Sequence, residues 1–145
     1  MNERYDQFTV LMTTINRNIK RIKTEEISKF NLKIQHISCL YYLYKKESLT
    51  SKELCEICEE DKAAISRALS DLETKGFLIY DSKKYRVPIV LTDKGIEMGE
   101  IIAHKIDSIL DFASEGISDE ERRIMYKCLN RINENLNQII NQHGN

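Results

Sequence analysis

With 145 residues, the chain falls in the usual single-domain range of about 100–200 residues, and its hydrophobic content of 41%, single proline and five glycines exclude a disordered chain and favour a helix-rich one. A net charge of −1 argues against a protein that coats nucleic acid indiscriminately. No apolar run approaches the roughly 18–20 residues that cross a bilayer, and the first residues lack a secretory apolar region, so we expect a cytoplasmic protein that does not enter a membrane.

Two amphipathic helices are predicted near the start of the chain. Apolar side chains recur every three or four residues from Tyr5 to Ile22 and again from Ile34 to Tyr44. In each segment this spacing places them on one face of a helix. The polar residues 45–48 end the second helix.

A short helix and a longer one, both with capping residues, follow. Thr50 and Glu53 have the spacing of a capping box, so a short helix should begin there. Its apolar pattern soon stops, and the carboxylate of Asp61 can cap the next helix. That helix is predicted over residues 62–75, with Gly76 in the left-handed conformation that ends many helices.

A β-hairpin is predicted next. Residues 77–80 and 87–91 favour strands, and the polar residues 81–86 between them favour a turn. Pro88 cannot donate a hydrogen bond to a ladder, so its strand should be short or lie at a sheet edge, as in a small wing beside a helical body.

Two further helices complete the prediction. Thr92 can cap a helix that reaches about Ala113, and Ser118 and Glu121 form a second capping box. Behind that box, apolar residues are spaced 4, 3, 4 and 3, as in a coiled-coil seam: Met125, Leu129, Ile132, Leu136 and Ile139. This spacing favours association between subunits over an intramolecular core.

The order of these elements predicts a winged helix-turn-helix. A capped short helix, a three-residue turn, a second capped helix and a hairpin follow one another. The expected fold class is therefore mainly α with a small β-hairpin wing, flanked by N- and C-terminal helices. In such a fold the second helix of the pair lies along the major groove of DNA, while the hairpin reaches the adjacent backbone.

The side chains available to DNA depend on which face of the 62–75 helix is buried. If Ile65, Leu69 and Leu72 face the core, the opposite face offers Arg67, which can form bidentate bonds with guanine or clamp a phosphate. Between residues 61 and 86, six basic side chains stand against four acidic ones, a balance of +2 where the remainder carries −3. The predicted DNA-binding residues are Ser51, Lys52, Lys62, Ala63, Ala64, Ser66, Arg67, Ser70, Lys83, Lys84 and Arg86. For the last three, the alternative interpretation is solvated charge on an exposed loop.

Four segments of the chain resemble the signature of the MarR family of winged helix-turn-helix transcriptional regulators: residues 49–54, 61–67, 72–78 and 91–95. The resemblance extends over nearly the whole chain. It implies a single domain over residues 1–145, with a DNA-binding lobe over 32–92 and dimerisation helices over 1–30 and 93–145. The residues expected at the dimer contact are Phe8, Met12 and Ile15, together with the five seam residues named above.

The same resemblance implies a mode of action. The expected protein is an obligate homodimer that binds a pseudo-palindromic double-stranded operator and represses transcription until a small ligand or an oxidant relieves it. The family often carries an acidic and basic pair near the tip of the wing, where this chain instead has Lys83, Lys84, Tyr85 and Arg86. We expect Arg86 and Lys84 to meet phosphate or the minor groove.

A ligand pocket is also implied by the resemblance. His36, Tyr41 and Tyr44 lie on the helix that in this family helps to wall such a pocket. An aromatic or phenolic acid would be the expected effector. The alternative is that the tyrosines simply pack with their hydroxyls at the surface.

Four cysteines raise the question of metal or redox chemistry. Cys55 and Cys58 form a CxxC motif, but no second pair of Cys or His completes a zinc site, so we expect neither a metal nor another cofactor. Packing as small apolar side chains is the favoured interpretation for these two and for Cys39 and Cys128. Thiol sensing stays open, although the peroxide sensors of the family carry their reactive cysteine near the start of the first helix, where this chain has none.

Catalysis is not expected, because the chain has no Gly-rich phosphate loop, GxSxG motif or HExxH motif. Two alternatives to a ligand-responsive DNA-binding regulator remain. One is a thiol- or metal-responsive sensor built on the same fold. The other is a winged-helix module that binds another protein instead of DNA.

Overall fold

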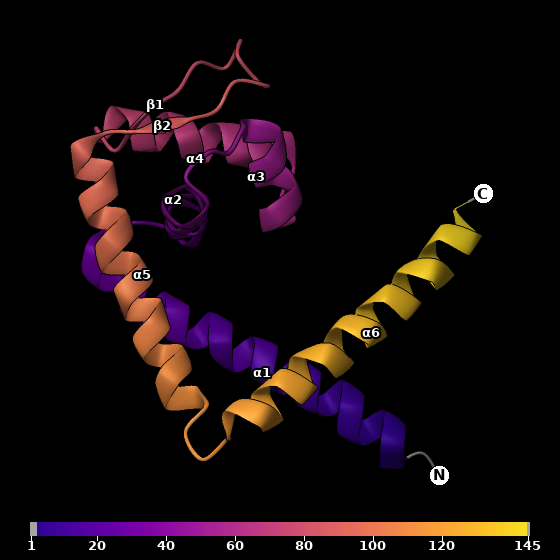
Figure 1. The fold of residues 1–145 in the computed structure, drawn as a ribbon. Helices are drawn as coiled ribbons and strands as arrows, with labels where there is room; N and C mark the ends of the chain where they lie inside the picture. The colour runs from indigo at the N-terminus through magenta and orange to yellow at the C-terminus, as the bar shows by residue number, and fades with distance from the viewer. Residues whose placement is uncertain (1–2, 145) are drawn as a thin grey trace. The chain divides into compact units, whose positions relative to one another are not determined.

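The computed structural model describes residues 3–144 (Figure 1). Their elements in chain order are α1 Glu3–Ile27, a 3-10 turn at Ser28–Phe30, α2 Ile34–Lys46, α3 Ser51–Cys58, α4 Lys62–Thr74, β1 Leu78–Ile79, β2 Val90–Leu91, α5 Asp93–Ala113 and α6 Asp119–His143. The chain forms two compact units, one that ends at Ile106 within α5 and one that begins at Asp107. The mainly α fold with a small β-hairpin is confirmed.

The capping interactions of the first unit explain why its short helices begin where they do. The Thr50 hydroxyl accepts a hydrogen bond from the Glu53 amide at 3.2 Å, and the Thr50 amide donates to the Glu53 carboxylate at 2.8 Å. The Asp61 carboxylate accepts from the Ala64 amide at 2.7 Å. Each bond satisfies a backbone donor that the first turn of a helix leaves free. The predicted starts of α3 and α4 are confirmed.

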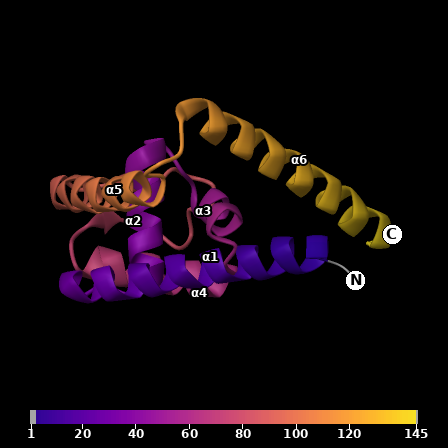
Figure 2. The ribbon, with the colours of Figure 1, turned by 90° about the horizontal axis from the view of Figure 1, so that it is seen from below.

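The core of the first unit lies where α2, α3 and α4 meet. Leu40 of α2, Leu54 of α3 and Leu69 and Leu72 of α4 are completely buried, and Ile102 of α5 closes the same core. Figure 2 shows α1 as one continuous helix that passes α2, with which it is in contact. The tri-helical arrangement leaves one side of α4 free.

The hairpin is smaller than the sequence predicted. Its strands pair antiparallel with Leu78 opposite Leu91 and Ile79 opposite Val90, so the predicted runs 77–80 and 87–91 were too long. The second run divides because its first half pairs elsewhere: the Ile89 amide donates to the Leu49 carbonyl at 2.8 Å, and Pro88 forms an isolated bridge with Thr50. The hairpin is thereby joined to the start of α3, and its connecting segment projects from the helices (Figure 1).

The first turn of α5 is fitted closely to the end of α4 and the hairpin. The Thr92 hydroxyl donates to the Gly76 carbonyl at 2.6 Å and accepts from the Gly95 amide at 3.1 Å, which confirms Thr92 as a cap. Gly76 has the predicted positive φ of 83°. A Cβ on Gly95 would lie 1.8 Å from the Phe77 carbonyl oxygen, so only glycine allows this approach.

The second unit contains the end of α5 and α6. Gly116, with a φ of 84°, lies in the turn between them. The Ser118 hydroxyl accepts from the Glu121 amide at 3.1 Å and the Ser118 amide donates to the Glu121 carboxylate at 2.8 Å, so the second capping box is confirmed. These bonds also lower the pKa of the Glu121 carboxyl. No described residue of α6 is fully buried; of its apolar seam, Leu129 and Ile132 are half-buried, and Met125, Leu136 and Ile139 are exposed.

Candidate nucleic-acid interface

Helix α4 has one buried and one exposed face. Ile65, Leu69 and Leu72 are completely buried, which confirms the predicted core face. The opposite face carries the exposed side chains of Lys62, Ala63, Arg67 and Ser70, while Ala64 and Ser66 are half-buried at its border. Among the residues that the structure describes, Arg67 forms no ion pair, so its guanidinium keeps its donors for an external acceptor.

Two tyrosines of the hairpin region contact the helices beneath it. The Tyr80 hydroxyl forms a hydrogen bond with the Ser66 hydroxyl at 3.0 Å, so Ser66 is engaged within the lobe. The Lys62 ammonium lies 4.5 Å from the centre of the Tyr85 ring. A cation at this distance is attracted by the negative face of an aromatic ring.

The Tyr85 hydroxyl also lies beside the Cys55 thiol of α3. Partial burial raises the pKa of Tyr85, and the neighbouring Cys55 adds to this rise. Tyr85 is half-buried although the rest of the connecting segment is exposed. Sequence reasoning missed both tyrosines. The signal in the sequence that could have identified them is that Tyr80 and Tyr85 flank the polar residues 81–84.

The segment between the strands presents the remaining predicted cations. Lys83, Lys84 and Arg86 are exposed. The Lys83 amide donates to the Asp81 carboxylate at 2.9 Å and the Lys84 amide donates to the Asp81 carbonyl at 2.9 Å, which fixes the backbone of this turn. Three basic side chains therefore project beside the exposed face of α4 on a segment that Tyr85 attaches to that helix.

The two predicted residues at the start of α3 differ in exposure. Lys52 is exposed, whereas Ser51 is only 2% exposed. The Ser51 side chain thus packs within the lobe, and an external group could meet only its backbone.

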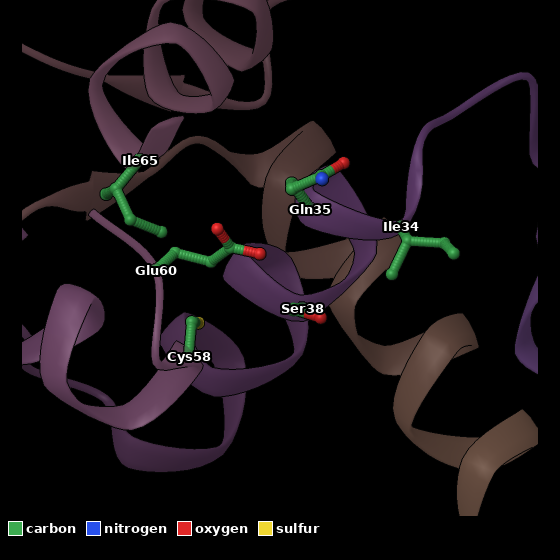
Figure 3. A pocket seen from close by; sticks show the side chains of 6 residues that line it. All are labelled: Ile34, Gln35, Ser38, Cys58, Glu60 and Ile65. Carbon is green, nitrogen blue, oxygen red and sulfur yellow. The ribbon is translucent and has the colours of Figure 1, made fainter. Parts of the chain in front are cut away.

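The three residues predicted to bind an effector lie in different environments. His36 is buried, and its Nδ1 accepts from the Lys33 amide at 3.1 Å while Nε2 lies 3.3 Å from the Asp71 carboxylate. Because Nδ1 is an acceptor, the neutral ring carries its proton on Nε2 and donates it to Asp71, which links α2 to α4. Tyr41 and Tyr44 are half-buried. None of the three lines the small hollow beside α2 shown in Figure 3.

Among residues 3–144, no group of three or more His, Cys, Asp and Glu side chains is arranged to hold a metal ion. Over the same residues, no helix combines the length and the apolar character that crossing a membrane requires.

Comparisons with known proteins agree with this geometry. A family model described as the MarR family matches residues 30–84. The HTH-type transcriptional regulator YdgJ of Bacillus subtilis is 30% identical over 106 residues, which cover 71% of this chain and 65% of YdgJ, slightly less than two thirds of that relative.

Solved structures share the fold over most of the chain. A MarR family protein from Bacillus stearothermophilus has a TM-score of 0.73 and 23% identity, covering 94% of this chain and 99% of its own. The MepR protein of Staphylococcus aureus, in complex with DNA, has a TM-score of 0.76 and 22% identity, covering 92% of this chain and 99% of its own. The predicted winged helix-turn-helix fold is confirmed.

Proposed function

We propose that this chain is a member of the MarR family, a transcriptional regulator that binds double-stranded DNA as a homodimer on a pseudo-palindromic operator. The observation that carries the proposal is the exposed face of α4, where Arg67 has no ion-pair partner among the described residues and basic side chains of the hairpin lie alongside. The DNA complex of the structurally similar MepR supports it.

In the proposed complex, α4 lies in the major groove. Arg67 contacts a guanine edge or a phosphate, and Ala63 and Ser70 are small enough to allow close approach of the helix. Lys62 lies at the first turn of α4, beside the hairpin, and is suited to phosphate. Lys83, Lys84 and Arg86 reach the flanking backbone or minor groove.

The distribution of charge on the chain determines how strongly salt should weaken DNA binding. The net charge of −1 gives little attraction at long range, so the affinity depends on the cations of this one face. Each phosphate contact releases counterions, and binding should weaken steeply as salt rises. If the chain instead bound another protein, its affinity would not need to fall steeply with rising salt concentration.

The homodimer is supported by apolar faces that the chain leaves uncovered. On α1, Phe8, Met12 and Ile15 are exposed, and on α6 Leu136 and Ile139 are about half exposed, at 49% and 51%. Exposed apolar stripes of this length mark association surfaces, and a two-fold dimer would bury them against a second copy. In this proposal residues 32–92 bind DNA, while 1–30 and 93–145 form the dimer.

We further propose repression that a small aromatic or phenolic effector relieves. Tyr41 and Tyr44 are half-buried and can offer both ring and hydroxyl to such a ligand. Both ring nitrogens of His36 already have partners within the lobe, so its contribution would be to hold α2 against α4.

The experiment that tests the DNA assignment compares two arginine variants. Operator DNA is first obtained by selection from random duplexes, and affinity is measured by fluorescence anisotropy. Arg67→Ala should lose about 1–3 kcal/mol of binding free energy, because a direct base or phosphate contact disappears. Arg17→Ala removes the same charge from the exposed side of α1 and should bind like the wild type. Equal affinities for Arg67→Ala and the wild type would refute the assignment of α4 as the recognition helix.

A further inference from the structure

The surface of α4 that faces away from the core has a central stripe and a border beside the hairpin. Ala63, Arg67 and Ser70 are spaced four and three residues apart and are all exposed, so they form the central stripe. Lys62 and Ser66 are four residues apart and therefore lie one helical turn from each other on the same side of α4. Both are in contact with residues that follow β1, which places them on the border.

Each of these border residues is held by one tyrosine. The Ser66 hydroxyl forms a hydrogen bond of 3.0 Å with the hydroxyl of Tyr80, the residue after β1. The Lys62 ammonium lies 4.5 Å from the centre of the Tyr85 ring. The two tyrosines stand at the two ends of the polar residues 81–84. The segment between the strands therefore fixes two side chains of α4 that lie one turn apart.

The hydroxyl pair of Ser66 and Tyr80 keeps one hydrogen for an acceptor outside the chain. Each hydroxyl carries one hydrogen, and the bond between them uses one of the two. Within residues 3–144, neither hydroxyl has a second hydrogen-bond partner. The Thr74 hydroxyl, by contrast, donates to the Ser70 carbonyl four residues earlier at 3.0 Å. Because Ser66 and Tyr80 are both partly exposed, the remaining hydrogen can reach an external group.

The chemistry of the two hydroxyls favours Tyr80 as the donor of their shared bond. A phenol donates a hydrogen bond more strongly than an aliphatic hydroxyl, because the ring withdraws electron density from its oxygen. The free hydrogen is then the one on Ser66. Accepting a bond from Tyr80 polarises the Ser66 O–H group and makes it a better donor. The Ser66 hydroxyl thus has a set direction before any partner arrives.

The surroundings of the border favour a phosphate as the acceptor. Lys62 places an ammonium on the same side of α4 as Ser66, and Lys83 and Lys84 are exposed on the neighbouring segment. The Asp81 carboxylate of that segment already accepts a hydrogen bond from the Lys83 amide at 2.9 Å. When a helix lies in the major groove, its central stripe faces the base edges, and its border faces the phosphate backbone that forms the wall of the groove.

On the basis of the proposed DNA-binding function, we propose that Ser66 donates a hydrogen bond to a backbone phosphate of the operator and that Tyr80 is the positioning residue that directs this hydroxyl. Lys62 supplies positive charge on the same side. Without the Tyr80 hydroxyl, Ser66 is free to donate to the Lys62 carbonyl four residues earlier, which withdraws it from the DNA. The contact fixes the position of α4 on the duplex and carries no sequence information of its own.

The contact is tested on the full-length protein with operator DNA obtained by selection, and affinity is measured by fluorescence anisotropy. Ser66→Ala and Tyr80→Phe should each bind roughly tenfold more weakly, as expected when a hydrogen bond to a charged group is lost. The double variant should bind no more weakly than Ser66→Ala. Tyr126→Phe removes the hydroxyl of an exposed tyrosine on α6 and should bind like the wild type. Wild-type affinity in Ser66→Ala, or losses that add up in the double variant, would overturn the proposal.

A second measurement separates a phosphate contact from a purely structural role. The operator is prepared as a series of duplexes in which one phosphate at a time is replaced by an uncharged methylphosphonate. At one position in each half-site this replacement should weaken binding by the wild type, and there Ser66→Ala and Tyr80→Phe should differ from it by less than about twofold. At the other positions the variants should keep their full disadvantage. A disadvantage that is equal at every position would overturn the proposal, because the substitutions would then act on the fold of the lobe.

The outcomes also distinguish this contact from the proposed function. If the wild type binds its operator but shares no phosphate position with Ser66→Ala, only the role of Ser66 and Tyr80 is overturned. If the wild type binds no DNA at all, the proposed function is contradicted and the contact falls with it. Alanine is a better helix former than serine, so Ser66→Ala should stay folded, which the midpoint of urea unfolding verifies.

Discussion

At the scale of single residues, Tyr85 attaches the segment between the two strands to the helices. Its ring lies 4.5 Å from the Lys62 ammonium of α4, and its hydroxyl lies beside the Cys55 thiol of α3. Because the neighbouring residues of the segment are exposed, few other contacts hold this part of the wing. A wing that is fixed before binding loses less conformational entropy when it meets the DNA backbone.

Two substitutions at Tyr85 separate its contacts. Tyr85→Leu removes both the ring and the hydroxyl, and we expect operator binding to weaken by about 1 kcal/mol, the size of an exposed cation–π contact. Tyr85→Phe keeps the ring beside Lys62 and should stay within about 0.5 kcal/mol of the wild type, since only the hydroxyl beside the Cys55 thiol is lost. Fluorescence anisotropy on the selected operator measures both. Wild-type affinity in Tyr85→Leu would show that the contact does not position the wing.

At the scale of elements, the junction of α4, the hairpin and α5 combines side-chain hydrogen bonds to backbone groups with a close backbone approach at Gly95. Thr92 bridges the Gly76 carbonyl and the Gly95 amide, and the Lys94 ammonium donates to the Lys75 carbonyl at 2.7 Å. These bonds satisfy carbonyls that the end of a helix leaves free. They join the lobe to the long helix that continues toward the second unit.

Gly95→Ala should disrupt this junction. Its Cβ would lie 1.8 Å from the Phe77 carbonyl oxygen and 3.2 Å from the Leu91 side chain, so the backbone has to move. We expect a loss of about 3 kcal/mol in the free energy of unfolding, at the upper end of the usual cost of overpacking. Gly144→Ala is the control, because its nearest neighbour would lie at 3.6 Å, an ordinary contact. Urea denaturation followed by circular dichroism measures both, and equal midpoints would contradict the packing described.

The elements also show which features a sequence can predict. Caps at Thr50, Asp61 and Ser118 were predictable because each joins residues three apart. The contacts of Tyr80 with Ser66 and of Tyr85 with Lys62 join residues 14 and 23 apart, and no local pattern specifies them. The strand lengths were wrong for the same reason, because Ile89 pairs with Leu49 instead of β1.

At the scale of the whole molecule, the proposed activity belongs to a pair of chains. One copy offers a single exposed face of α4 and uncovered apolar stripes on α1 and α6. A two-fold dimer would bury those stripes and repeat α4 with inverted direction, so that each copy reads half of the site. The operator sequence therefore reports both on recognition and on assembly.

The proposed recognition by α4 is tested most directly by selection of bound sequences from random duplex DNA with the purified full-length protein. We predict enrichment of two inverted half-sites with centres about 10 base pairs apart, one turn of the double helix, and loss of that enrichment for Arg67→Ala. Failure to enrich any sequence, or enrichment of a single site without an inverted repeat, would contradict it.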